Sequence, residues 1–434
     1  MMELIQHINN FIWGIPLLFL LMGTHLYFSI KLHFPQRRIF YAIRLSLGIG
    51  ADDSGDKNLS PFSALATTLA ATLGTGNIIG VSTAVALGGP GAIFWCWITG
   101  ILGMATAYSE CYLSVLFRTR QKDGTHVGGP MYVLKNGLHN KNLGAFYAFC
   151  TLLAAFGVGC TTQANSVTQA ATASFSVSPH LVGITLAFLT GSVILGGVKV
   201  IGNLCERMVP AISFVYLFGC FLLLCLYYRQ LPAACLWILR DAFSISSLAG
   251  GFAGSTLQLA LRYGIARGLF TNEAGIGTSA IAAAASGTSD PRKQAYVSMT
   301  AVFWDTVVMC LVTGLVVVCN MIYDPASIVG VSETNLTSAA FAHLPYVGDA
   351  FLTISLAAFA VTTLIGWSYF GEKATEYLVG SKGIPYYKLL YILMIYFGAI
   401  IPMHLVWECT DLINGLMVLP NLLALFLLRR QIKP

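Results

Sequence analysis

The feature that most constrains this chain is an uncharged run from Asn58 to Ser109, which contains no Asp, Glu, Lys or Arg. The run is long enough for two bilayer crossings, because one membrane-spanning helix needs about 20 apolar residues. Gly74-Thr75-Gly76-Asn77 interrupts it near the middle. Lipid cannot satisfy a free backbone group, so non-helical backbone at this depth persists only where it is buried in protein or lines a polar cavity. The interruption therefore predicts a binding site between two half-helices.

The composition of the whole chain indicates that most of its surface faces lipid. Of 434 residues, 56% are hydrophobic and 10% are charged, whereas soluble domains carry about 25% charged residues. We therefore predict an all-α, polytopic membrane protein with a single transmembrane domain over residues 1–434. The net charge of +6 does not indicate nucleic-acid binding, because the basic residues cluster at predicted helix ends.

Eleven apolar segments are long enough to cross a bilayer. They cover about 11–30, 62–86, 91–117, 143–174, 181–198, 208–228, 247–284, 296–322, 349–378, 386–406 and 411–429. The first is expected to be a retained extra N-terminal helix, because it lacks the positive segment and cleavage site of a signal peptide. Residues 35–47 fit either an interfacial amphipathic helix or an ordinary basic loop.

Lys and Arg concentrate in alternate loops. The basic loops lie around residues 31–44, 118–122, 199–207, 292–293, 373–382 and 429–433. The intervening loops contain few basic residues, and Arg229 and Arg240 are the main exceptions. The positive-inside rule then predicts an external N-terminus and a cytoplasmic C-terminus.

A second interruption, at Asn272–Gly277, lies in the seventh predicted span, five spans after the first. Five is odd, so the two halves of the chain would have opposite orientations in the membrane. Paired interruptions at corresponding positions are typical of inverted-repeat transporters and mark their binding sites. We therefore predict two five-helix repeats, at about 58–228 and 245–430.

Each interruption allows more than one interpretation. Unwound backbone at the first offers amides that suit a carboxylate and carbonyls that suit a cation, and Asn77 adds a side-chain oxygen. The alternative is a helix-packing face, because Gly76 and Gly80 have small-xxx-small spacing. Near the second, Arg267 and Glu273 either pair across the unwound turn or the arginine reaches the membrane interface.

Other polar side chains inside spans could complete a pocket. Gln163 lies in a long uncharged segment and needs hydrogen-bond partners. Thr362 and Thr363 could bind a ligand or could bond to their own helix. Glu110 is interpreted as an interfacial, solvated carboxylate, and Asp305 receives no role. The eleven cysteines contain no CxxC pair and the histidines do not cluster, so no metal centre is indicated.

Four segments together resemble a known family, the alanine or glycine:cation symporters, a branch of the leucine-transporter-type fold. The segments are Gly88–Trp97 (GGPGAIFWCW), Gly128–Tyr132 (GGPMY), Arg267–Gly277 (RGLFTNEAGIG) and Gly366–Glu372 (GWSYFGE). The resemblance implies eleven helices, one extra N-terminal helix before two inverted repeats with discontinuous helices. It also implies secondary active uptake of alanine or glycine, usually driven by sodium.

The resemblance also implies roles for individual residues. Substrate would meet the backbone amides of Gly74, Thr75 and Gly76, then Asn77, Gln163 and Thr363, with Phe270, Ile276 and Trp367 as pocket walls. One sodium ion would lie by Asn77 and Thr271, and a second by the carbonyls of Ala70 and Leu73 and the hydroxyls of Thr362 and Thr363. Thr363 cannot easily serve substrate and cation together, so one of its two roles would be wrong.

The expected partners are a small amino acid, sodium as the coupling ion, and the lipid bilayer of a bacterial inner membrane. We expect a monomer that has no other cofactor and is not an enzyme, because no Ser/His/Asp set is present. D-amino acids remain open as substrates. The alternatives are proton-coupled symport through Glu273 or Asp305, and an ion channel, although no repeated filter sequence is found.

Overall fold

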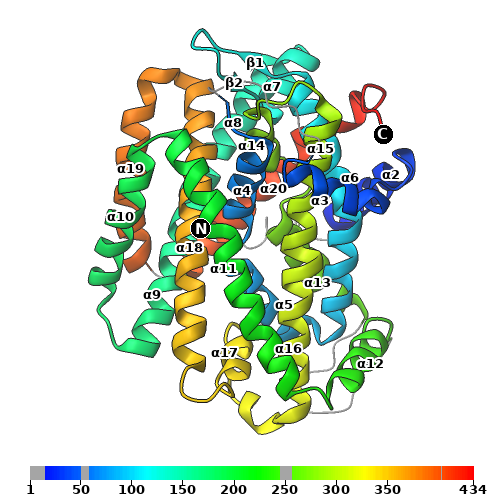
Figure 1. Cartoon of the computed structure of the whole chain (residues 1–434), viewed down its shortest axis with the longest axis vertical. Helices are drawn as coiled ribbons and strands as arrows, with labels where there is room; N and C mark the ends of the chain where they lie inside the picture. Colours follow the sequence, from blue (N-terminus) through cyan, green and yellow to red (C-terminus); the bar gives the residue numbers. More distant parts are fainter. Residues whose placement is uncertain (1–14, 50–57, 245–256, 402) are drawn as a thin grey trace.

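Long helices make up almost all of the structure, a computed structural model that describes residues 15–49, 58–244, 257–401 and 403–434 (Figure 1). Helices satisfy every interior backbone group within one segment, as lipid requires. In the described residues the paired strands are β1 (Thr119–Arg120) and β2 (His126–Val127), which form a short antiparallel hairpin. The predicted all-α class is confirmed.

The N-terminal half begins several helices with proline at the first turn and a side-chain cap before it. Ser60 accepts a hydrogen bond from the amide of Ser63, with Pro61 opening the helix. The helical elements are α2 (Ile15–Lys31), η1 (Pro35–Arg38), α3 (Ile39–Ser46), α4 (Pro61–Thr72), η2 (Thr75–Asn77), α5 (Ile79–Gly88), α6 (Gly91–Leu116), α7 (Pro130–Tyr132), η3 (Val133–Gly137), α8 (Lys141–Phe156), η4 (Gly157–Thr161), α9 (Thr162–Phe175), α10 (Pro179–Leu195) and α11 (Val198–Leu226).

The C-terminal half uses the same signals, for example Asp290, which caps the helix that Pro291 opens. Its elements are α12 (Leu231–Asp241), α13 (Leu257–Asn272), α14 (Ser279–Ala284), α15 (Pro291–Val302), η5 (Phe303–Cys310), α16 (Leu311–Tyr323), η6 (Pro325–Ile328), α17 (Leu336–Phe341), α18 (Gly348–Val379), η7 (Ser381–Gly383), α19 (Ile384–Ile400) and α20 (Met403–Leu427). The elements η3, η4 and η5 are π-helical turns. Two of them, η4 and η5, lie inside long helices, which fits the tendency of π-turns to mark functional positions.

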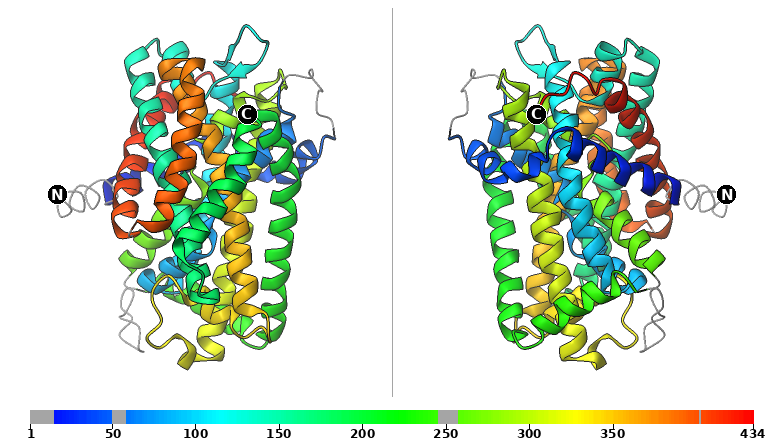
Figure 2. Two further views of the ribbon diagram at one scale, coloured as in Figure 1. Left: turned by 90° about the vertical axis from the view of Figure 1, so that its left-hand side faces the viewer. Right: turned by 90° about the vertical axis from the view of Figure 1, so that its right-hand side faces the viewer.

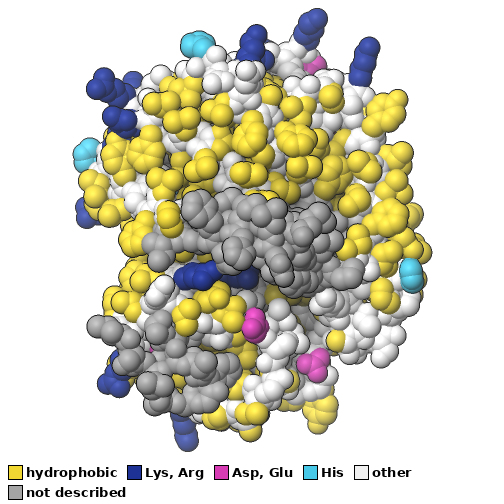
Figure 3. Space-filling view, turned by 180° about the vertical axis from the view of Figure 1, so that it is seen from behind, with side chains coloured by type: hydrophobic (Ala, Val, Ile, Leu, Met, Phe, Trp, Pro, Cys, Tyr) yellow, Lys and Arg dark blue, Asp and Glu magenta, His cyan; other side chains and the backbone are white. Residues whose placement is uncertain are grey.

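Several helices are long enough and apolar enough to span a membrane. Among the described residues, six helices are long and apolar enough to cross a bilayer, or up to eight if each bent pair is one span. One bent pair is α2 with η1 and α3, at 64°, and the other is α4 with η2 and α5, at 59°. Hydrophobic side chains dominate the face in Figure 3, as expected of a surface in lipid.

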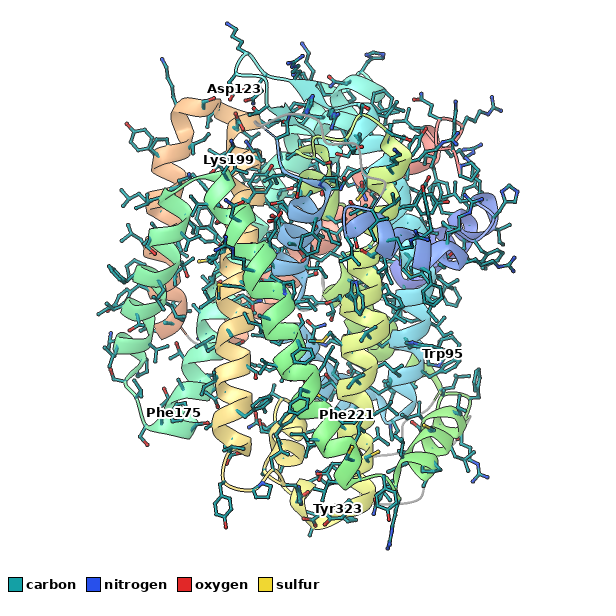
Figure 4. The ribbon with its side chains drawn as sticks, in the orientation of Figure 1. Trp95, Asp123, Phe175, Lys199, Phe221 and Tyr323 are labelled. Carbon is teal, nitrogen blue, oxygen red and sulfur yellow. The ribbon has the colours of Figure 1, made fainter. Side chains whose placement is uncertain are left out.

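The loops sort to the two ends of the bundle as the basic pattern predicts. The hairpin β1–β2, the start of α11 and the turn between α18 and α19 lie at one end, whereas α12 and α17 lie at the other (Figure 1). Asp123 and Lys199 mark the first end, and Phe175 and Tyr323 mark the second (Figure 4). Which end faces the cytoplasm stays a prediction.

Residues 35–46 are helical, so the helical alternative for this basic segment is confirmed. Ala42 and Leu45 are buried, while Phe40 and Leu47 are exposed. Figure 2 shows α2, the blue helix, crossing the long helices at a steep angle. An interfacial position for this segment stays a prediction.

Candidate functional site

The first interruption is real. Helix α4 ends at Thr72, α5 begins at Ile79, and their axes differ in direction by 59°. Gly74 has extended backbone (φ −141°, ψ −154°), and its amide donates to Oδ1 of Asn77 at 3.0 Å. The side chain of Asn77 thus replaces a helical acceptor and holds the unwound turn in place.

The second interruption is also real. Helix α13 ends at Asn272 and α14 begins at Ser279. Between them, Glu273, Gly275 and Gly277 have left-handed backbone with φ of +56°, +96° and +93°. Glycine adopts this conformation at little cost, which explains the two glycines. Oδ1 of Asn272 accepts the amide of Ala274 at 3.0 Å and so closes the turn.

The two interruptions lie against one another. A Cβ atom built on Gly76 would lie 3.3 Å from Oγ1 of Thr271 and 3.8 Å from Cδ1 of Phe270. Helices α5 and α13 run side by side at this level (Figure 1). A Cβ atom built on Gly80 would have no neighbour within 4 Å. The packing-face interpretation of Gly76 and Gly80 is therefore wrong, because only Gly76 meets a neighbouring helix.

Helices α9 and α18 close the first interruption from the other side. A Cβ atom on Gly74 would lie 2.7 Å from Oγ1 of Thr363 and 3.3 Å from Oε1 of Gln163. The amide of Thr75 points to Oε1 of Gln163 at 3.4 Å. Two residues that the sequence nominated from distant spans, Gln163 and Thr363, thus meet at Gly74.

The residues nominated for a second cation are only partly assembled. The hydroxyl of Thr363 lies 3.1 Å from the carbonyl oxygen of Leu73. The hydroxyl of Thr362 donates to the carbonyl of Phe359 within its own helix, at 2.8 Å, and the hydroxyl of Thr363 also lies within hydrogen-bond distance of that carbonyl, at 3.0 Å. A Cβ atom on Gly366 would lie 2.6 Å from the amide nitrogen of Ala71, so α18 and α4 approach closely beside Ala70. Two oxygens are therefore adjacent here, of the kind that hard cations prefer.

Asn77 also connects the first interruption to α15–η5–α16. Its Nδ2 donates to Oδ1 of Asp305 at 2.8 Å and to the carbonyl oxygen of Asp305 at 3.1 Å. Oδ2 of Asp305 accepts the hydroxyl of Thr306 at 2.6 Å. Asp305, which the sequence suggested only for the alternative of proton coupling, is fully buried and anchors a nominated site residue. The nominated Thr271 donates to Arg267 in its own helix at 2.8 Å.

The three nominated wall residues surround the second interruption. Trp367 is 1% exposed and packs on Gly159 of η4, where a Cβ atom would lie 2.2 Å from that of Trp367. The buried Nε1 of Trp367 has no hydrogen-bond partner, although Glu273 lies nearby. Ile276 is buried, and its carbonyl accepts the hydroxyl of Tyr147 at 2.8 Å. Phe270 is partly buried beside Gly76.

The sequence interpretation of Glu110 is wrong. Glu110 is not solvated at an interface but is 2% exposed. Its Oε1 accepts the amide of Gly275 at 2.8 Å and Nδ2 of Asn421 at 2.6 Å. The unwound turn supplies a free amide that a carboxylate can use deep in the bundle, and no local sequence signal shows that contact. For the same reason, the sequence did not identify Asn421 as a residue that contacts this turn.

The structure gives Glu273 a hydrogen bond with Thr278 and places Arg267 beside the ring of Phe270. Glu273 accepts a hydrogen bond from the hydroxyl of Thr278, across its own turn. The guanidinium of Arg267 lies 5.8 Å from the centre of the Phe270 ring. The suggested pairing of Arg267 with Glu273 stays a prediction.

The assembled residues are closed off from solvent. Thr75, Asn77, Gln163, Thr363 and Trp367 are each 4% exposed or less. A small ligand held between the two interruptions would thus be occluded, and helices would have to move to admit or release it. An all-α membrane protein whose two discontinuous helices meet at one buried polar site has the architecture of a secondary transporter.

Comparisons with known proteins agree with this class. A family model described as the sodium:alanine symporter family matches residues 1–433. The sodium/alanine symporter AgcS of Methanococcus maripaludis is 42% identical over 98% of this chain and 94% of its own length. A probable sodium/glutamine symporter, GlnT of Bacillus subtilis, is 34% identical over 100% of this chain and 90% of its own length.

The fold is also found among solved structures. A sodium-coupled sialic acid symporter superposes with a TM-score of 0.59 at 12% identity, covering 97% of this chain and 87% of the other. That likeness concerns the fold alone. The match of the family model and the identity to AgcS decide the family: the chain belongs to the sodium:alanine symporter family, and it is a membrane transporter.

Proposed function

We propose that this protein takes up a small neutral amino acid, alanine or glycine, together with sodium, by alternating access. The observation that carries the proposal is the meeting of the two interrupted helices, where Gly74 and Gly76 face Thr363, Gln163 and Thr271. Backbone amides lie there beside side-chain hydroxyl and amide groups, and the amides of Gly74 and Thr75 bond to side-chain oxygens of Asn77 and Gln163 instead of to a helical ladder. They can satisfy both ends of a zwitterion, which is costly to move through hydrocarbon.

In this proposal the amides near Gly74, Thr75 and Gly76 bind the substrate carboxylate, which would replace the side-chain oxygens of Asn77 and Gln163 that accept from the first two amides in the structure. Gln163 serves the ammonium group, because its Oε1 already lies beside Gly74. Trp367, Phe270 and Ile276 limit the side chain to a hydrogen or a methyl group. One extra methylene is worth about 1–3 kcal/mol of discrimination, so leucine should bind much more weakly than alanine.

Sodium would occupy two oxygen-lined positions, one where the two interruptions meet and one beside the end of α4. The first would use Asn77 and Thr271, which flank Gly76. The second would use the carbonyls of Ala70 and Leu73 with the hydroxyls of Thr362 and Thr363. The short distance between Thr363 and the Leu73 carbonyl favours the cation role for Thr363, and this leaves Gln163 as the ammonium partner.

Proton-coupled uptake of the same substrates is the second candidate. One observation favours it. The hydrogen bonds given for these two buried carboxyl groups come from neutral donors: the hydroxyl of Thr278 for Glu273, and the hydroxyl of Thr306 and the amide of Asn77 for Asp305. A proton could serve in place of a cation at such a group.

The deciding experiment is uptake into proteoliposomes under an imposed sodium gradient, with labelled L-alanine, D-alanine and glycine in separate assays. The same assay with sodium replaced by potassium at constant pH separates the two candidates. The proposal predicts saturable accumulation that requires sodium. Uptake that continues unchanged without sodium excludes sodium coupling, and current without substrate or saturation would indicate a channel.

The proposal places the N-terminus outside and the C-terminus in the cytoplasm of a bacterial inner membrane, with the protein acting as a monomer. The support is the gathering of basic loops at the end of the bundle that carries β1 and β2 (Figure 1). Single cysteines introduced at Lys122 and at Tyr323, in a variant whose native cysteines, including the exposed Cys225 and Cys235, are replaced by serine, test the orientation through their reaction with an impermeant thiol reagent. The residue at position 323 should react from outside and the residue at position 122 only after permeabilisation.

A further inference from the structure

Two buried side chains, of Glu110 and Asn421, bind the backbone amide and the backbone carbonyl of Gly275 in the second interruption. Oε1 of Glu110, from α6, accepts the amide of Gly275 at 2.8 Å. Nδ2 of Asn421, from α20, donates to the carbonyl of Gly275 at 2.9 Å and to Oε1 of Glu110 at 2.6 Å. We propose that Glu110 and Asn421 act together as a positioning clamp that sets the unwound shape of the second interruption and thereby the affinity for substrate and sodium.

The position of Gly275 explains why fixing its backbone affects the proposed substrate and sodium positions. It lies next to Ile276, a wall of the proposed pocket, and four residues after Thr271, a proposed sodium ligand. Its φ of +96° is far from the helical region, so its amide and carbonyl cannot join a regular helical ladder. Both groups are taken by the clamp instead, and neither is left unpaired in the low-dielectric interior.

The clamp also joins two helices, α6 and α20, to the second interruption. Glu110 belongs to α6, which packs along α13, and Asn421 belongs to α20, near the C-terminus. Asn421 further limits the turn sterically, because a Cβ atom on Gly277 would lie 2.9 Å from its amide group. The two helices thus fix the second interruption independently of α9 and α18, which close the first.

Burial makes this clamp more than a packing contact. Glu110 and Asn421 are 2% and 3% exposed, so water cannot replace a lost partner. A buried polar group that loses its hydrogen-bond partner carries its full desolvation cost. Oε2 of Glu110 has no hydrogen-bond partner, so the bond through Oε1 and the amide of Gly275 carries the attachment. The proposal rests on the proposed sodium-coupled uptake.

The test measures uptake per inserted molecule for Glu110→Ala, Asn421→Ala, the double variant and Glu110→Gln. The matched control is Ser109→Ala, because Ser109 is buried on the same helix and, among the described residues, its hydroxyl donates to the carbonyl of Ala105 within that helix. Each alanine variant should raise the half-saturation concentrations for substrate and sodium by about tenfold to a hundredfold. Glu110→Gln keeps the acceptor oxygen and should stay within a few-fold of the wild type.

The double variant distinguishes a joint clamp from two separate contacts. A joint clamp predicts that the double variant is little worse than either single one, since coupled residues are not additive. Unchanged half-saturation concentrations, with only less protein in the membrane, would overturn the proposal and leave a purely structural role. If Glu110→Ala does not insert, Asn421→Ala carries the test, because it leaves the bond from Gly275 to Glu110 in place. A wild type without sodium-driven uptake would instead overturn the proposed function itself.

Discussion

Replacement of Gly74 by alanine tests the site through a single added methyl group. The backbone at Gly74 is extended, with φ of −141° and ψ of −154°, and because φ is negative the main effect of the added methyl group is steric. The new Cβ would lie 2.7 Å from Oγ1 of Thr363, closer than real Cβ contacts come. Thr363 must therefore move, and its 3.1 Å contact with the Leu73 carbonyl is lost. Overpacking of this kind costs about 1–3 kcal/mol of stability, and the same cost imposed on the ligand-bound state alone corresponds to roughly a five- to 150-fold loss of affinity.

The assay is sodium-dependent uptake over a range of substrate concentrations, normalised to inserted protein. Gly80→Ala is the matched control, because Gly80 lies on the second half of the same interrupted helix and has open space around it. It should behave like the wild type. Gly74→Ala combined with Thr363→Ala should be less impaired than the sum of the two single effects, because the clash is gone. An unaltered half-saturation concentration in Gly74→Ala would refute the reasoning.

Three further outcomes are expected. Asn77→Ala should insert normally but lose uptake, because the bonds that join Gly74 and Asp305 disappear; normal transport by this variant would count against the site. Trp367→Ala should let leucine compete with alanine, and Trp367→Phe serves if that variant is unstable; continued exclusion of leucine by an inserted variant would remove Trp367 from the pocket wall. Uptake should carry an inward current that requires both sodium and substrate. The membrane potential contributes about 2.3 kcal/mol per 100 mV for each net charge that moves inward. Electroneutral uptake would argue against the transport of one sodium ion with each zwitterion.

The sequence was most informative where a local rule of lipid physics applies. Uncharged apolar runs predicted the helices, and glycine clusters inside them predicted both interruptions. The reason is physical: hydrocarbon leaves the backbone few alternatives, and left-handed residues such as Gly275 and Gly277 favour glycine. Gln163 and Thr363 were nominated as polar side chains inside apolar spans, their specific roles came from the family resemblance, and the structure brings both side chains to Gly74.

The sequence was least informative about contacts between distant helices. Glu110 and Asn421 both hold Gly275, yet neither has a local pattern that identifies its partner. A carboxylate near the end of an uncharged run looks interfacial until a free amide is known to lie beside it. Asp305 is similar, because its partner Asn77 lies on another helix. The π-turn that sets Gly159 against Trp367 also has no sequence signal that we could use.

The central claim is that two interrupted helices together hold an amino acid beside sodium. Calorimetric titration of the purified protein with L-alanine, D-alanine and glycine, with and without sodium, measures that claim most directly. Binding should require sodium and should weaken strongly in both Gly74→Ala and Asn77→Ala, while Gly80→Ala binds normally. Equal binding in the absence of sodium, or binding unchanged by both site substitutions, would contradict the account.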